Sequence, residues 1–113
     1  MELNEFKEKF NSINLKDEKL QDYIKYIAED IDENYSVSQH IIICIEECSE
    51  LQQTLTKLIR GKTEDKMHIL EEMADVTLAI KYLQNNLNIS DEELNKAICV
   101  KAKRNYDRYY ALT

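Results

Sequence analysis

The chain has 113 residues and a formal net charge of −7, with one glycine and no proline. So short a chain suits one domain, and the near absence of turn-forming residues argues against a strand-rich fold. The acidic balance argues against binding to nucleic acid polymers or anionic membranes, which repel a negatively charged protein, and suits a protein that gathers cations.

No segment is typical of a targeting or membrane-spanning sequence. The first ten residues are charged and lack the apolar stretch of a signal peptide, and the longest apolar run, residues 41–45, is far shorter than a membrane span. The three cysteines, at positions 44, 48 and 99, have neither the number nor the spacing of a disulfide framework. We therefore expect one cytoplasmic domain over residues 1–113.

Apolar residues at helical spacing predict one short helix or arm followed by four main helices. The expected ranges are about 3–10, 17–33, 37–60, 64–87 and 91–111. Long helices joined by short connections favour antiparallel neighbours, so we predict an all-α fold, an antiparallel bundle of the four main helices.

Capping signals mark the ends of the predicted helices. Ser36 with Gln39, and Ser90 with Glu93, have the spacing of capping boxes at helix starts. Gly61 suits the left-handed residue that follows a helix end.

The fourth predicted helix has the pattern of a bundle helix. Thr63 can cap its start, and its apolar stripe from Ile69 to Leu87 advances in alternating steps of four and three residues. We therefore expect this helix to pack along its neighbours.

Two successive helices each carry a pair of carboxylates one turn apart, beside the apolar face. At about 100° per residue, Glu47 borders the apolar arc of its helix, and Glu50 follows on the same flank. Glu72 and Asp75 take the corresponding place on the next helix. Four carboxylates on one seam repel each other unless a cation lies among them, and such hard oxygen ligands select Mg²⁺, Mn²⁺ or Ca²⁺.

Other polar residues divide into outward and inward groups. Glu46 and Glu71 fall roughly opposite the apolar stripes, where we expect solvated side chains. On the last helix, Lys101, Asn105 and Arg108 recur at spacing 0, 4, 7 near the middle of the apolar face. Long polar side chains on an inward face need partners there, which could be carboxylates or a phosphate.

The ordered set of these residues resembles the MazG-type all-α nucleotide pyrophosphohydrolases. The segments EECSEL at 46–51 and EEMADV at 71–76 match the family's ExxE and ExxD motifs, and the spacing of Lys101, Asn105 and Arg108 matches its KxxxNxxR pattern. The resemblance covers residues 37–110.

This resemblance implies a hydrolase acting on phosphoric anhydrides, which converts a nucleoside triphosphate and water to the monophosphate and pyrophosphate in a house-cleaning role. It implies Mg²⁺, with Mn²⁺ as a possible substitute, and a water activated by the metal as the nucleophile. It also implies a homodimer or homotetramer. The implied metal-binding and catalytic residues are Glu47, Glu50, Glu72 and Asp75. Those implied at the phosphates are Lys101, Asn105 and Arg108.

His40 is a further candidate for substrate binding, because it lies two turns before Glu47 on the same flank and could contact a base or ribose. A structural role is the alternative for this residue. For the whole chain, the alternatives are a non-catalytic helical-bundle interaction protein and, within the same superfamily, a phosphoribosyl-ATP pyrophosphohydrolase.

Overall fold

The computed structural model describes residues 1–62 and 65–111, without side-chain detail at residues 21 and 31–33. Every regular element in this part of the chain is a helix, as predicted. The helices are α1 (Leu3–Ser12), α2 (Glu18–Asn34), α3 (Val37–Ile59), α4 (Lys66–Leu87) and α5 (Asp91–Ala111). The all-α prediction is confirmed, and each boundary lies within two residues of its expected place.

The caps explain why α3 begins and ends where it does. The Ser36 hydroxyl accepts from the Gln39 amide at 3.2 Å, and the Gln39 side chain accepts from the Ser36 amide at 2.7 Å. At the other end, Gly61 has φ 79°, and the Gly61 and Lys62 amides donate back to the last turn of the helix. This is the Schellman arrangement, which satisfies carbonyls that the helix itself leaves open.

The start of α4 differs from the expectation. Asp65 is its N-cap, with a side-chain oxygen that accepts from the Met67 amide at 2.8 Å. The same carboxylate pairs with Lys7, which ties α1 to α4. Thr63, the expected cap, lies outside the described residues. Aspartate is as good an N-cap as threonine. With Asp65 as the cap, α4 begins at Lys66.

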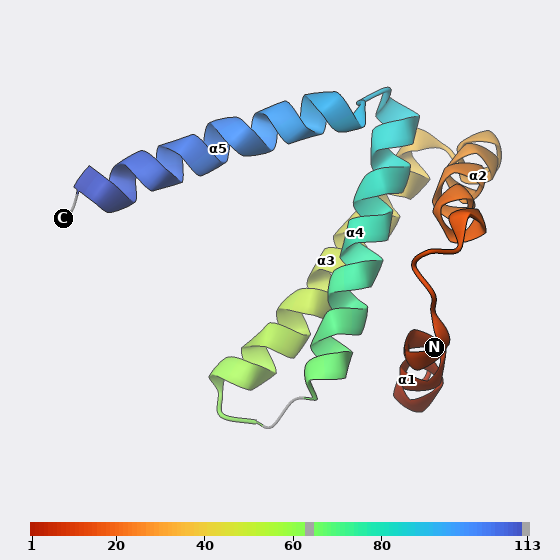
Figure 1. Cartoon of the computed structure of the whole chain (residues 1–113), viewed down its shortest axis with the longest axis horizontal. Helices are drawn as coiled ribbons and strands as arrows, with labels where there is room; N and C mark the ends of the chain where they lie inside the picture. The colour runs from red at the N-terminus through yellow and green to blue at the C-terminus, as the bar shows by residue number, and fades with distance from the viewer. Residues whose placement is uncertain (63–64, 112–113) are drawn as a thin grey trace.

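Helix α4 is the centre of the fold. The antiparallel helix α3 lies along it, α2 packs against its second half, and α1 touches it (Figure 1). Small side chains allow the close approach, since the buried apolar residues of the described chain are Ala28 on α2 and Ala79 on α4. The Asn85 side chain donates to the Ala28 carbonyl at 3.3 Å and fixes α2 to α4.

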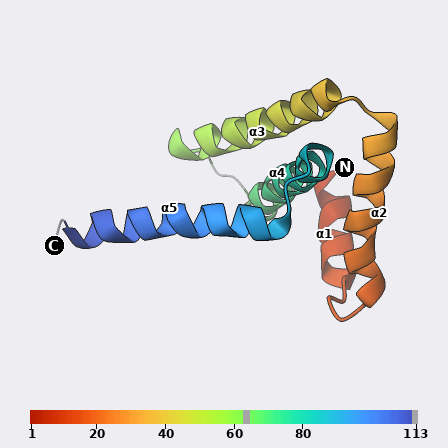
Figure 2. The same cartoon turned by 90° about the horizontal axis from the view of Figure 1, so that it is seen from above.

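Helix α5 does not join the other helices, so the predicted four-helix bundle is not observed within this chain. It leaves the end of α4 and extends away from the other described helices in both views (Figures 1 and 2). The reason lies at the turn. Asn88, at φ 57°, ends α4, and the Ser90–Glu93 capping box starts α5 in a new direction.

The chain is less compact than a folded monomer of its size. Its radius of gyration is 16.9 Å, against about 13 Å expected for 113 residues. It exposes 9161 Å², against roughly 6,500 Å² expected for a monomer of its mass. The excess is about 2,700 Å², and many large apolar side chains are among the exposed residues. No helix in the described residues is long and apolar enough to cross a membrane.

Candidate metal centre

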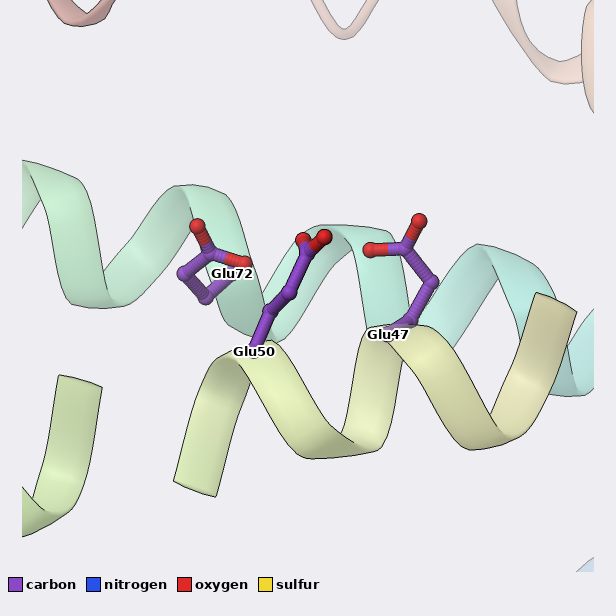
Figure 3. A group of neighbouring side chains, drawn as sticks. All are labelled: Glu47, Glu50 and Glu72. Atoms are coloured by element: carbon purple, nitrogen blue, oxygen red, sulfur yellow. The ribbon is translucent and has the colours of Figure 1, made fainter. Parts of the chain in front are cut away.

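Three of the four predicted carboxylates come together between α3 and α4. Glu47 and Glu50 lie one turn apart on α3, and Glu72 lies on α4 (Figure 3). One oxygen from each of the three lies within 4.8 Å of the others. Two helices running in opposite directions therefore bring together residues that are more than twenty positions apart in the sequence.

The helical period explains this meeting. Residues at i and i+3 share a flank, so Glu47 and Glu50 both lie on the side of α3 that α4 covers. His40 and Thr54, the two buried residues of α3, lie on this same side. In Figure 3 the Glu50 carboxylate lies between those of Glu47 and Glu72. Glu50 is exposed, so the cluster is buried on one side and open on the other.

Asp75 lies beside the group of three but is not a member of it. It is one turn after Glu72 on α4 and half-buried. Its negative charge acts on both Glu47 and Glu72 and raises the pKa of each. The fourth predicted carboxylate is therefore part of the same electrostatic site.

The carboxylates are held in a setting unfavourable to their negative charge. Burial is the largest cause that raises the pKa of Glu47, Glu72 and Asp75, and repulsion by neighbouring carboxylates adds to it. The Oε2 atoms of Glu47 and Glu72 are buried without a hydrogen-bond partner. A buried carboxylate oxygen without a partner costs folding free energy. A cation or a hydrogen-bond donor beside these two oxygens would remove that cost.

This donor set fits a hard divalent cation. All the atoms that converge are carboxylate oxygens, which Mg²⁺ and Mn²⁺ prefer. A cation among them would compensate the repulsion and satisfy the Oε2 atoms of Glu47 and Glu72. Glu47, Glu50 and Glu72 would hold it, with Asp75 alongside.

Two neighbours of the cluster were not identified in the sequence. His68 Nε2 lies 3.3 Å from Glu72 Oε1, and a protonated His68 lowers the pKa of Glu72. Glu71 was expected to be solvated, but it is half-buried and its charge raises the pKa of Asp75. The i, i+4 spacing of His68 and Glu72 could have indicated the first contact. The second depends on how α4 is covered by its neighbours. Glu46 is exposed, as predicted.

The phosphate-contacting residues predicted from the last helix lie away from the carboxylates within this chain. Lys101, Asn105 and Arg108 lie on α5, are exposed, and extend away from the carboxylates with that helix (Figure 1). No cation of α5 is among the charges that shift the pKa of Glu47 or Glu72. The predicted inward packing of α5, which would bring these residues to the carboxylates, is not observed within this chain.

His40 is enclosed and does not face a substrate. It is 3% exposed, its ring meets the Tyr35 ring edge-on at 6.1 Å, and its Nε2 has no hydrogen-bond partner. In this arrangement the ring has no free surface for a base or ribose. The position of His40 therefore favours a structural role over substrate binding.

Compared with protein-family models, curated proteins and solved structures, the chain gives no significant match. Only the residues themselves and their arrangement therefore indicate a function.

Proposed function

We propose that this chain is a magnesium-dependent nucleoside triphosphate pyrophosphohydrolase with a house-cleaning role in the cytoplasm. The observation that carries the proposal is the group formed by Glu47, Glu50 and Glu72, in which two buried oxygens have no partner. The order and spacing of the ExxE and ExxD motifs, which resemble those of the MazG-type enzymes, support the same reaction.

The charge of the chain favours a reaction that includes a cation. A triphosphate is polyanionic, and a protein of net charge −7 would repel it. A divalent cation, Mg²⁺ or Mn²⁺, would neutralise the phosphates, polarise the α-phosphorus and favour ionisation of the attacking water.

In the proposed reaction, water attacks the α-phosphorus. The bond from this phosphorus to the bridging oxygen breaks, and pyrophosphate leaves. An ionised carboxylate of the cluster accepts the proton of the water.

The proposed assembly is a homodimer or homotetramer. The large exposed surface and the unaccompanied α5 support this part of the proposal. Lys101, Asn105 and Arg108 would contact phosphates, and α5 would need a different setting from that in the single chain to reach them.

The test is pyrophosphate release from a panel of nucleoside triphosphates with Mg²⁺, and with EDTA as the control. We expect EDTA-sensitive release of pyrophosphate and monophosphate. Glu50→Gln and Asp75→Asn should each reduce it by more than about 100-fold, because each removes a charge from the proposed metal site, while helical circular dichroism is unchanged. Glu46→Gln, the exposed neighbour of Glu47, is the matched control and should keep full activity.

Either of two results would contradict the proposal. The first is absence of release from every triphosphate, and the second is full activity of Glu50→Gln. If phosphoribosyl-ATP alone is hydrolysed, the alternative substrate within the superfamily is correct. No hydrolysis together with no change in the melting temperature on adding Mg²⁺ would support a non-catalytic interaction protein.

A further inference from the structure

The outer half of α3 is an uncharged apolar surface that nothing in the described chain covers. We define the α3 stripe as the residues that line it in alternating steps of four and three. They are Ile41, Ile45, Cys48, Gln52, Leu55 and Ile59. All six are exposed, Ile45 to 62% and Ile59 to 86%.

Charge distribution separates this stripe from an ordinary solvated face. A third of the residues in the chain are charged, and α3 has Glu46, Glu47, Glu50 and Lys57. At 100° per residue, all four fall on the half of the helix away from the α3 stripe. The stripe is flanked by uncharged residues, among them Ser49 and Thr56. Absence of charge is typical of the core of a protein–protein interface.

The α3 stripe is complementary to itself. When two copies of α3 are laid side by side in opposite directions and centred near residue 50, Ile41 faces Ile59 of the second copy. In the same register Ile45 faces Leu55, and Cys48 faces Gln52. Each apolar position then meets an apolar one, and the polar Gln52 falls near the centre beside a small thiol. A two-fold axis requires this kind of self-complementarity.

We propose that the α3 stripe is the interface of a homodimer, in which α3 packs antiparallel against α3 of a second copy. Alternating four-three spacing suits side chains that interlock between two helices at a shallow crossing angle. The whole chain, α5 included, exposes about 2,700 Å² more than a compact monomer, and an obligate dimer interface removes about 1,000–2,500 Å² from each subunit, so burial of the α3 stripe would account for part of this excess. The carboxylates, on the other side of α3, remain free.

This inference deepens the assembly part of the proposed function and does not depend on the hydrolysis. The first measurement is sedimentation equilibrium of the full chain at micromolar concentration. We expect a dimer, twice the chain mass of 13.4 kDa. Ile45→Glu should weaken association by at least about 100-fold, because a charge is buried in each half of the interface. Ile42→Glu is the matched control, since Ile42 is 53% exposed but off the stripe, and it should stay dimeric.

A second measurement does not depend on a disruptive variant. In a chain with Cys44→Ser and Cys99→Ser, Cys48 is the single thiol. In the antiparallel register, Cys48 faces Gln52 of the second copy, so the two copies of Cys48 are offset by about one helical turn along the interface. A short bismaleimide should therefore link most of the protein into covalent dimers, and Ile45→Glu should abolish this product.

Each other outcome contradicts the inference. A monomeric wild-type chain would exclude both the interface and the proposed assembly, while leaving the hydrolysis open to its own test. A dimer that Ile45→Glu and Ile42→Glu affect equally would place the interface elsewhere. A dimer that depends on Ile98, on the exposed face of α5, and gives no Cys48 product would show that α5 covers the second copy instead.

Discussion

At the scale of single residues, the main feature of the cluster is that the charges acting on Glu47, Glu72 and Asp75 are mostly those of other carboxylates. Glu47 and Glu72 each have a buried oxygen without a partner, and Asp75 adds a third negative charge. His68, beside Glu72, lowers the pKa of Glu72 and so partly offsets the effect of the neighbouring carboxylates. This setting is unfavourable to the ionised carboxylates, and the cation of the proposed function would offset that cost.

This cost predicts an unusual pH dependence of stability. Because the folded chain raises the pKa of Glu47, Glu72 and Asp75, it binds protons more tightly than the unfolded chain does. Their contribution to stability is therefore fully present below the ordinary carboxyl pKa of about 4. It is lost as the pH rises through the raised pKa.

Glu47→Gln tests this relation in the metal-free protein. We expect its melting temperature in EDTA at pH 7.5 to exceed that of wild type by about 2–4 °C, because the substitution removes one of several partly screened like charges. At pH 4 the difference should vanish. With Mg²⁺ at pH 7.5 the order should reverse, because wild type gains more from the metal.

The other carboxyl groups contribute equally to the stability of wild type and of Glu47→Gln, so their contributions cancel in the difference between the two melting temperatures. Glu5 and Asp65, whose pKa values are lowered by Lys9 and Lys7, act in the opposite direction but equally in both proteins. Glu46→Gln, at an exposed site, should not shift the melting temperature at either pH. A Glu47→Gln protein less stable than wild type in EDTA at pH 7.5 would show that the carboxylates stabilise the apo fold.

At the scale of the element, local capping defines α3, and α3 has two different faces. One face meets α4 and carries the carboxylates, and the other is the uncharged stripe. Both faces follow from the spacing of residues along one helix, because the helical period fixes the angles between them. The capping box of Ser36 and Gln39 fixes where this helix begins.

Ser36→Ala should destabilise the protein by about 1 kcal/mol, because the Gln39 amide loses its acceptor. For a domain of this size the melting temperature should fall by roughly 4–8 °C. Ser38→Ala, one position inside the same first turn, is the control and should be neutral or slightly stabilising, since alanine is the better helix former. Thermal unfolding at one protein concentration gives both values, and equal effects of the two changes would refute a special role of the cap.

At the scale of the whole molecule, the described chain is extended and exposes a large surface. Its radius of gyration and exposed area both exceed those of a compact monomer, and α5 packs along no other described helix. Burial of the apolar surface exposed on α3 and α5 would favour association of the folded chain.

Association predicts that the melting temperature depends on protein concentration. A second copy binds the folded chain and not the unfolded one, so mass action raises stability as concentration rises. Between about 1 and 100 μM we expect a rise of several degrees for wild type and for Ile42→Glu. For Ile45→Glu we expect almost none. A wild-type melting temperature that is constant over this range would indicate a monomer.

The sequence by itself determined what depends on near neighbours. The range of each helix, the capping boxes at Ser36 and Ser90, and the shared flank of Glu47 and Glu50 follow from side-chain chemistry and a fixed period. The phase was also sufficient to separate the exposed Glu46 from the half-buried Glu47.

Only the tertiary structure decided which neighbour each face meets. Periodicity predicts that α3 has an apolar arc, but α4 covers the flank with His40 and Glu47 and leaves the α3 stripe open. It does not predict the half-burial of Glu71, nor the direction of α5 after Asn88. The physical reason is that a helical period fixes angles about one axis, whereas the positions of separate axes depend on side chains distant in the sequence.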